Sequence, residues 1–586
     1  MTQQGFRLNR IRQAILLTGL LGLPVMVQAQ TVDIEQRQRE QLEQQRAQQI
    51  QQQEQRATQL NKTPSEPLPP QTNPPTPTND TCFPIQQIHW NQSDIDPPRY
   101  LRYQAQAAII DEYARPQCMN QTQLAALQKS LNNSLIEHGH ITSKVNFPSQ
   151  NLTTGVLNID WYPGVVSKVT YDASKGKPIG SLSTLYPWQE GRLYNQRHAD
   201  QALENLKRLG SQGNASIDLK PGAQPGSSEI QYSIEPQPYY KRIHGSVGID
   251  NSGSDSTGQY QGNASLTIDS PLYLNDQLTL NYNRNTDVAA DQHNTKSLGA
   301  YWDVNFGYLN LNLGYTRSTY LQTQPGLHTP EVITEDTAIE GKSQDYYIGL
   351  GYMLYRNSDS KLQLTSKLGR KASHTYYNQT ENPYQMRDYV YVDSGLNYTL
   401  YRKDQQYTLS ANLRQNLPQH SKALGEIYGY PNWDGKWRVY TVNATANIPF
   451  KLKEHAFKYN SSLKLQHGER PLPASEQLSI GSRYSVRGFD ETFSLSAEDG
   501  LVWRNELAYL YGANQAQQIY LGLDYGVIHG PATEEAAGNS LAGAALGVRG
   551  SWHGIGYDLA LAMPLHKPKY IKTDTPAFYG SLNWSF

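Results

Sequence analysis

The sequence lacks the long apolar runs that membrane-spanning helices need. A helical span takes about 20 consecutive apolar residues, and no such run occurs after the first thirty positions of this 586-residue chain. The sequence also lacks a charge excess, because 51 basic and 52 acidic residues leave a formal net charge of −1. A bundle of membrane helices is therefore excluded, and a nucleic-acid binder, which usually carries a basic excess, is disfavoured.

The N-terminal segment has the composition of an export signal. Arg7, Arg10 and Arg12 give it a positive start, an apolar run follows over 14–27, and Ala29 ends a small-residue cleavage site. The apolar run is too short for a stable membrane helix. We therefore predict a signal peptide over 1–29, with an N-terminal anchor as the alternative, and expect the mature chain to leave the cytoplasm.

Cysteine is nearly absent, since Cys82 and Cys118 are the only two. Export would bring both to an oxidising compartment, where disulfides form and persist. We expect the two to be joined, the alternative being two buried free thiols. The closed loop of about 35 residues would contribute roughly 3–4 kcal/mol in the chain-entropy model.

Composition divides the rest of the N-terminal half into distinct segments. Twelve Gln and no Gly or Pro between positions 31 and 60 predict a polar helix over 30–61, although a disordered Gln-rich tail would have the same composition. Seven prolines over 62–80 indicate a semi-extended linker. Residues 81–163 and 164–236 each combine helical periodicity with short strands, which predicts two small α/β modules. We expect strands over 83–90, 140–147, 155–161, 164–172, 215–219 and 229–235, and helices over 100–113, 121–137 and 195–209.

From residue 237 to Phe586 the hydrophobic period becomes two, as in Leu521 and Leu523 alternating with Asp524. Such alternation, an even strand count and alternating short and long connections predict a sixteen-stranded transmembrane β-barrel with a polar lumen. A soluble β-protein, which also alternates, is the alternative. The sixteen segments start near residues 240, 257, 276, 296, 307, 344, 360, 387, 405, 437, 456, 500, 517, 540, 553 and 576. The long connections are expected over 317–343, 371–386, 415–436, 468–498 and 563–575.

The C-terminal strand and the aromatic residues favour an outer-membrane barrel over a soluble protein. Leu582, Trp584 and Phe586 share one face of the last strand. A C-terminal strand that ends in Phe resembles the assembly signal of outer-membrane barrels. Tyrosines and tryptophans near the segment ends are interpreted as an interface girdle. These are Tyr301, Trp302, Trp437, Tyr440, Trp503, Tyr509 and Trp584.

A predicted long loop over 467–498 carries the run Val486-Arg487-Gly488-Phe489. Gly488 permits a tight backbone at this tip. An arginine fixed at a loop tip calls for a carboxylate, because its planar guanidinium pairs bidentately with one.

The strand pattern offers Asp524 as that carboxylate. It lies opposite the outward leucines of its segment, so we expect it to face the lumen, where Gly522 and Gly526 leave room for an incoming side chain. We predict that the loop folds into the barrel and that Arg487 pairs with Asp524. Glu506 also faces the lumen and is the rival partner, and a solvated loop arginine is the alternative without a contact.

No enzymatic signature stands out in the sequence. His138 and His140 flank a Gly without support from Cys or carboxylates, which suits the end of a helix better than a metal site. No paired carboxylates, nucleophile motif or phosphate-binding loop stand out. We therefore expect no catalytic residues, no cofactor and no bound metal.

The ordered set of motifs resembles the two-partner secretion transporters, the TpsB family. The resemblance covers nearly all of 31–586, and one departure is Ala497, where the family more often has Gly at the exit of the long loop. The motifs are Cys82-Phe83-Pro84-Ile85 onward to Gly164, the run from Glu137 to Ser143, the run from Pro221 to Gly226, Ser485-Val486-Arg487-Gly488-Phe489 and Leu523-Asp524-Tyr525-Gly526.

The resemblance implies an architecture and a location. It implies a plug helix at 30–61, two POTRA domains at 81–163 and 164–236, and a barrel over 237–586 with the loop 467–498 folded inward. The barrel would lie in the outer membrane of a Gram-negative bacterium, with the POTRA domains in the periplasm. The Arg487–Asp524 contact is also a feature that the resemblance implies.

The resemblance further implies secretion of a large unfolded exoprotein of the TpsA type, without ATP. Adhesins, haemolysins and, for CdiB-like members, contact-dependent inhibition toxins are the open classes of cargo. Outer membrane lipid and the barrel assembly machinery are the other expected partners. An outer-membrane protein assembly factor and a passive porin are the rival functions, but two α/β modules and a plug candidate favour secretion.

Overall fold

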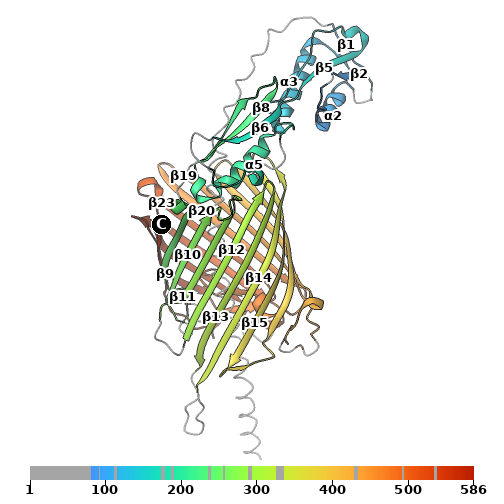
Figure 1. Cartoon of the computed structure of the whole chain (residues 1–586). Coiled ribbons are helices and arrows are strands. Elements are labelled where there is room, and N and C mark those ends of the chain that lie inside the picture. Colours follow the sequence, from blue (N-terminus) through green and yellow to red (C-terminus); the bar gives the residue numbers. More distant parts are fainter. Residues whose placement is uncertain are drawn as a thin grey trace, which may run out of the picture.

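The computed structural model describes residues 81–586 apart from short gaps. The signal peptide, polar helix and linker predicted over 1–80 lie outside the described residues. Two small α/β modules lie at one end of a large β-barrel (Figure 1). Among the described helices, none has the length and apolar character needed to cross a membrane. The gaps are 92, 111–114, 173–177, 186–189, 235–238, 255–257, 288–292, 325–335, 428–429, 431–432, 491–493 and 534–537.

The first module packs two helices on a three-stranded sheet of order β2-β5-β4. The predicted stripe of α3 is buried through Leu127, Leu131 and Leu135, and Asn120 caps the helix in a reciprocal pair with Gln123. The first module contains β1 (Phe83–Pro84), β2 (Gln87–Trp90), α2 (Arg99–Ala108), β3 (Cys118–Met119), α3 (Gln121–Glu137), β4 (Lys144–Asn146) and β5 (Val156–Tyr162).

The disulfide expected between Cys82 and Cys118 is confirmed, with the two Cα atoms 5.3 Å apart. The single strand expected over 83–90 is wrong, because it is divided into β1 and β2. Strand β1 pairs with β3 next to the disulfide, whereas β2 pairs in parallel with β5 in the main sheet. The cross-link thus holds a separate two-stranded sheet beside the main sheet of the same module.

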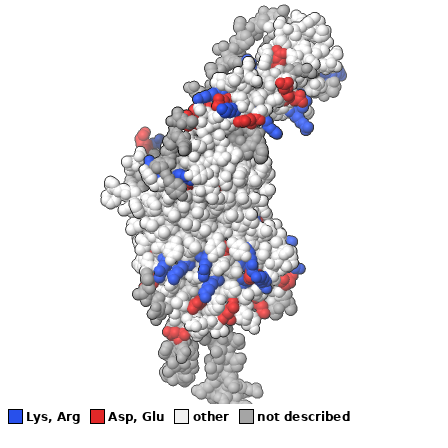
Figure 2. All heavy atoms as spheres, in the orientation of Figure 1, with Lys and Arg blue, Asp and Glu red and all other residues white. Residues whose placement is uncertain are grey.

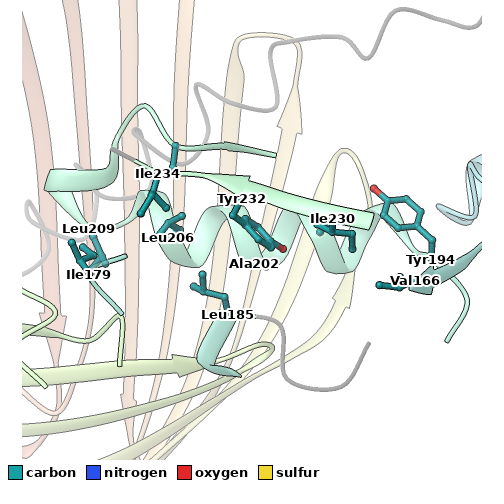
Figure 3. Packing of buried hydrophobic residues seen from close by; sticks show 12 residues of the cluster. Val166, Ile179, Leu185, Tyr194, Ala202, Leu206, Leu209, Ile230, Tyr232 and Ile234 are labelled. Atoms are coloured by element: carbon teal, nitrogen blue, oxygen red, sulfur yellow. The ribbon is translucent and has the colours of Figure 1, made fainter. Parts of the chain in front are cut away.

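The second module repeats this arrangement, with sheet order β6-β8-β7 and α5 packed on the sheet. Figure 3 shows Leu206 of α5 beside Ile234, with Tyr232 of β8 further along the same helix, and all three are buried. The side chain of Asn195 caps α5 by accepting a hydrogen bond from the backbone of Arg197. The module contains β6 (Val165–Tyr171), α4 (Leu182–Leu185), α5 (Gln196–Lys207), β7 (Ser216–Pro221) and β8 (Ser227–Ser233).

Sixteen long antiparallel strands and the two-residue β16 form a closed barrel, as predicted. The last strand closes on the first, with Trp584 opposite Val247. Closure leaves no unpaired sheet edge in the membrane. The strands are β9 (Ile243–Asp250), β10 (Gln261–Asp269), β11 (Gln277–Asn285), β12 (His293–Phe306), β13 (Leu309–Gln324), β14 (Thr337–Arg356), β15 (Ser360–Tyr377), β16 (Thr380–Glu381), β17 (Arg387–Arg402), β18 (Gln405–Asn416), β19 (Arg438–Leu452), β20 (His455–Gly468), β23 (Asp499–Tyr511), β24 (Gln517–His529), β25 (Ser540–Trp552), β26 (Ile555–His566) and β27 (Ala577–Ser585).

Two of the predicted long connections are shorter than expected, because the strands extend into them. Strands β13 and β14 together occupy most of 317–343, and β15 extends to Tyr377. Tyr320 and Ile339 are buried against each other in this extension, with Tyr377 beside them, so an apolar contact continues the ladder beyond the expected turn.

The interface girdle is only partly as predicted. Tyr440, Trp503 and Trp584 are exposed on the outer face. The girdle prediction is wrong for Trp437, because this residue is 2% exposed and its ring meets that of Tyr389 edge-on at 5.5 Å between centroids. The girdle prediction is also wrong for Tyr301, because this residue alternates with the outward Trp302 and faces the lumen.

The residues predicted to form an assembly signal lie on the outer face of the last strand. The side chains of Leu582, Trp584 and Phe586 are 48%, 51% and 54% exposed.

Seven short 3₁₀ turns complete the described structure. They are η1 (Leu152–Thr154), η3 (Gly210–Gln212), η4 (Tyr239–Arg242), η5 (Pro418–His420), η6 (Ala474–Glu476), η7 (Ala513–Gln515) and η8 (Pro531–Thr533).

Candidate functional site

The connection from β20 to β23 is a loop with a small structure of its own. It contains η6 and a hairpin of β21 (Leu478–Ile480) and β22 (Leu495–Ala497). Val486 and Phe489 at its tip are 0% and 1% exposed, in one apolar cluster with Ile528 and Leu541 of the wall. Apolar burial thus holds the tip against the lumen side of the barrel.

Arg487 binds Asp524 through two parallel hydrogen bonds. Its Nε donates to Oδ2 at 2.6 Å and its Nη2 donates to Oδ1 at 2.8 Å. Its backbone N–H also donates to Oδ2, at 3.1 Å. The Asp524 side chain is 0% exposed and that of Arg487 is 7% exposed, so this is a buried, bidentate ion pair.

Glu506, the predicted rival, binds the same arginine instead of replacing Asp524. Its Oε2 accepts a hydrogen bond from Arg487 Nη1 at 2.8 Å. Arg549 reaches its other oxygen, Oε1, at 3.0 Å and then pairs with Asp558 at 2.8 Å. The two predicted partners are therefore consecutive members of one network.

The network is electrically balanced. Arg504 adds a third guanidinium, 3.9 Å from Asp524, and donates to the backbone carbonyl of Tyr484 in the loop. The three arginines face three carboxylates, so the charges sum to zero (3 − 3). Balance of this kind lowers the cost of removing charges from water. The members are Arg487, Arg504, Arg549, Glu506, Asp524 and Asp558.

Glycines on the wall make the space that the loop tip occupies. A Cβ at Gly522 would lie 2.4 Å from Arg487 Cζ, and one at Gly526 would lie 2.8 Å from a methyl group of Val486. The room predicted at these two positions is thus filled by the tip. A third glycine, Gly543, makes room in the same way but was not predicted from the sequence. A Cβ at Gly543 would lie 1.7 Å from the Arg487 carbonyl oxygen.

Gly488 and Tyr579 fix the backbone of the tip. Gly488 has φ +115°, in the region that favours glycine. The backbone N–H groups of Gly488 and Phe489 donate to Tyr579 Oη at 2.9 and 3.1 Å, and this hydroxyl donates to the Phe489 carbonyl at 2.7 Å. The alternation of β27 places Tyr579 inward, but nothing in the sequence pairs it with the loop.

A second contact, also missed from the sequence, holds the base of the loop. Glu476 of η6 accepts a hydrogen bond from Tyr389 Oη at 2.6 Å and lies 3.4 Å from Arg414 Nη1. The Arg414 guanidinium lies over the ring of Tyr391, 4.0 Å from its centroid. The loop is therefore anchored at its base to β17 and β18 and at its tip to β23 and β24.

The second module is docked onto the near end of the barrel through α5. The Glu204 carboxylate accepts hydrogen bonds from Lys361 Nζ at 2.6 and 2.7 Å and from Arg356 Nη1 at 2.5 Å. Burial alone would raise the pKa of the Glu204 carboxyl, but the charges of Lys361 and Arg356 outweigh burial and lower that pKa to about 2. These three charges join the module to the turn between β14 and β15.

Two further barrel turns meet the same module. Asn205 donates to the Gly307 carbonyl at 2.8 Å, and Asn275 donates to Thr184 Oγ1 at 2.9 Å. Arg208 forms an ion pair with Asp303 and donates to the Asn275 carbonyl at 2.9 Å. The module is thus fixed to three consecutive turns at its end of the barrel.

The histidine pair has structural contacts. His138 ends α3 and stacks on Tyr100 at 3.8 Å between ring centroids, with Gly139 at φ +88° after it. A ring nitrogen of His140 lies 2.8 Å from the Tyr194 carbonyl oxygen, which ties the two modules together. Within the described residues, no group of three or more His, Cys, Asp or Glu side chains is placed to hold a metal ion.

Comparison with known proteins adds family and fold. Residues 226–550 match the family described as "Haemolysin secretion/activation protein ShlB/FhaC/HecB", and residues 83–164 match "POTRA domain, ShlB-type". The outer membrane transporter CdiB-2 of Burkholderia pseudomallei is 29% identical over 517 residues, 86% of this chain and 86% of that protein. The hemolysin transporter protein ShlB of Serratia marcescens is 23% identical and covers 67% of each chain.

Solved structures agree with this assignment. CdiB from Escherichia coli superposes with a TM-score of 0.80 at 25% identity, covering 94% of this chain and 98% of that one. CdiB from Acinetobacter baumannii has the same fold, with a TM-score of 0.75 at 23% identity over 92% and 98% of the two chains.

Proposed function

We propose a mechanism of client secretion for this chain, which belongs to the haemolysin secretion/activation family ShlB/FhaC/HecB. It is an outer-membrane transporter of two-partner secretion, whose POTRA modules lie in the periplasm. The pore captures an unfolded exoprotein and passes it to the cell surface. The finer steps below are inferred from the residues that would carry them.

The domain boundaries follow the changes in composition and the described elements. A signal peptide, a plug helix and a linker would precede the two POTRA domains and the barrel. Among these, the plug helix and the loop that folds into the barrel are the parts that must move for a client to pass. The boundaries are 1–29, 30–61, 62–80, 81–163, 164–236 and 237–586, with the inward loop at 467–498.

The lock between Arg487 and Asp524 is the working contact of this loop. The observation that carries the proposal is the buried, bidentate pair inside the lumen, at 2.6 and 2.8 Å. A solvated loop would gain little from such a pair, because exposed ion pairs are worth about 0–1 kcal/mol. A buried pair instead selects one loop position, which releases when the contact is broken.

The free edges of the module sheets are the proposed capture surface. Each three-stranded sheet has two edge strands, and β7 (Ser216–Pro221) is an exposed edge strand. An unfolded client can add a strand to such an edge, with affinity supplied by main-chain hydrogen bonds and little demand on sequence. Direction would come from client folding outside the cell, without ATP.

We infer a contact-dependent inhibition exoprotein of the TpsA type as the client, since several curated relatives are named CdiB. The test is secretion of a contact-dependent inhibition exoprotein of the TpsA type, expressed with the intact chain or with an empty vector. Release to the surface only with the intact chain supports the proposal. Release of a ShlB-type haemolysin but not of the contact-dependent inhibition exoprotein would contradict it.

Recognition of the C-terminal strand by the barrel assembly machinery is proposed as well. Leu582, Trp584 and Phe586 present one apolar stripe at the end of β27. Because these side chains face lipid in the finished barrel, their role in assembly is separable from the lumen contacts. Replacing Phe586 by Ala should lower the amount of inserted barrel, measured by its heat-resistant migration on a gel.

A further inference from the structure

The lipid-facing side of five consecutive strands carries a line of basic residues, here called the basic row. Figure 2 shows Lys and Arg gathered across this face at the level away from the modules, with a largely uncharged surface between this row and the modules. The basic row consists of Arg284 on β11, Lys296 on β12, Arg317 on β13, Lys342 on β14 and Arg370 on β15.

These side chains point out of the barrel and not into its lumen. Successive residues of a strand alternate between faces. Lys296 shares its face with Leu298 and Arg317 shares its face with Leu313, and these leucines are 40% and 42% exposed. Lys342 likewise shares its face with Tyr346, which is 45% exposed.

The basic row lies at the outer boundary of the apolar band. Leu309 begins the outward face of β13 at the module end, and Arg317 follows eight residues later on the same face. Eight residues of a strand cover about 26 Å, and a strand tilt of about 40° reduces this to roughly 20 Å along the barrel axis. An outer-membrane barrel has an apolar band about 25 Å tall, so Arg317 lies near the outer edge of that band, and its long side chain extends to the outer-leaflet headgroups.

Strand register brings the charges close together. Arg284 is directly opposite Lys296, and Thr319 is opposite both Lys296 and Lys342. Strands are spaced about 4.8 Å apart, so Lys296 and Lys342 are roughly 10 Å apart at their backbones. Like charges directly opposite each other destabilise a sheet, which favours an anion between them.

Only part of the basic row is neutralised by the protein. Arg370 is paired with Asp388 by two bonds of 2.6 Å, and Lys342 lies 3.9 Å from Glu340. Arg284, Lys296 and Arg317 have no ion pair with a carboxylate in the part of the chain that the structure describes. Three neighbouring cations at headgroup level therefore lack a counter-charge from any described residue.

We propose that the basic row binds the phosphate groups of the phosphorylated glycolipid of the outer leaflet, lipid A. Arginine and lysine form short, charge-assisted hydrogen bonds with phosphate, and the apolar band below would contact the acyl chains of the same lipid. This inference rests on the outer-membrane location and is independent of the loop contacts. The competing explanation is that the side chains only extend toward water.

The test uses the full-length protein, purified in a neutral detergent and titrated with lipid A that carries both phosphates. The variant is the triple substitution Arg284→Gln, Lys296→Gln and Arg317→Gln. The matched control is Lys403→Gln, Lys451→Gln and Lys453→Gln, which removes three exposed lysines at or beside the turns at the module end. Native mass spectrometry counts bound lipid, and the unfolding temperature of the barrel reports its effect.

We expect the wild type and the control to bind the phosphorylated lipid at least tenfold more tightly than the triple variant does. Removing both phosphates enzymatically should lower wild-type binding to the level of the variant. Equal binding by wild type and triple variant, equal binding of the dephosphorylated lipid, or equally tight binding of phosphatidylglycerol would each overturn the proposal. Exoprotein secretion is measured in parallel, so that loss of lipid binding with intact secretion is distinguished from failure of the transport function.

Discussion

The guanidinium of Arg487 lies against the backbone of Gly522, where an added Cβ would stand 2.4 Å from its Cζ atom. Real Cβ atoms do not approach a neighbour this closely, so any side chain at this position must displace the arginine. The wall of the barrel therefore takes part in the lock through an absent side chain as well as through Asp524.

We predict that Gly522→Ala releases the loop tip without preventing barrel assembly. The added methyl group should cost about 1–3 kcal/mol as overpacking, borne by the loop contact. Protease accessibility of the loop on intact cells should rise and exoprotein secretion should fall. The matched control is Gly262→Ala on β10, where a Cβ meets nothing closer than 3.7 Å. Equal behaviour of the two variants would contradict the prediction.

We predict that Arg487→Ala abolishes or strongly reduces secretion while the barrel still inserts. Breaking a buried pair by removing one partner costs about 3–5 kcal/mol, because Asp524 would then keep only Arg504, at 3.9 Å, as a cationic partner among the described residues. Asp524→Ala should give a similar loss, because Glu506 alone then faces Arg487 and Arg504. The double variant should be no worse than either single one, as expected for coupled residues. Strictly additive losses of secretion would show that the two side chains act separately.

We predict that Tyr389→Phe loosens the base of the loop. The change removes one hydrogen bond to the Glu476 carboxylate, and a bond to a charged group is worth about 1.5–3 kcal/mol. Hydrogen exchange over residues 472–480 should become faster, while exchange at the tip changes less. Tyr398→Phe, which alters an outward-facing tyrosine, is the control. Unchanged exchange in both variants would place the anchor elsewhere.

We predict that acid loosens the second module from the barrel through Glu204. Its folded pKa of about 2 lies below its ordinary value of 4.5. The carboxylate therefore contributes its full stabilisation above about pH 4.5 and loses it as the pH falls toward 2. Distances between spin labels on module and barrel should broaden over this window. In the Glu204→Gln variant, the distribution of spin-label distances should be broad already at pH 7. A wild-type distribution that stays narrow down to pH 2 would refute this role of Glu204.

We predict that deleting residues 31–60 raises ion conductance in planar bilayers. The composition of this segment suits a polar helix, and the polar lumen is the environment that such a helix needs. Secretion should continue, because the helix must leave for a client to pass. Wild-type conductance in the deletion variant would remove the plug from the mechanism.

Local pattern was sufficient to predict the barrel and the contact between Arg487 and Asp524. Period-two alternation gave sixteen strands, since each strand must satisfy lipid on one face and water on the other. The same alternation placed Asp524 inward, and the glycines beside it indicated room. Tyr301 and Trp437 were misplaced because their position near strand ends was weighed above the face on which each lies.

Contacts between distant segments were not predictable in this way. Glu204 and Lys361 are 157 positions apart, and their pairing depends on how a helix of one domain meets a turn of another. Glu476, Arg414 and Tyr389 lie on three separate elements, each with an ordinary polar pattern. Burial and partner choice at such sites arise only when the whole chain is folded.

The two anchors of the loop have a consequence for the kinetics of opening. Eleven positions separate Glu476 from Arg487, so the chain between them spans at most about 40 Å when fully extended. A tip that leaves Asp524 while Glu476 still holds remains tethered, and its return is a unimolecular search at a high effective concentration. Closure of a segment of about ten residues takes on the order of 10–100 ns in a free chain. The pore should therefore behave as a hinged gate that recloses after each passage, and not as a stopper that is lost.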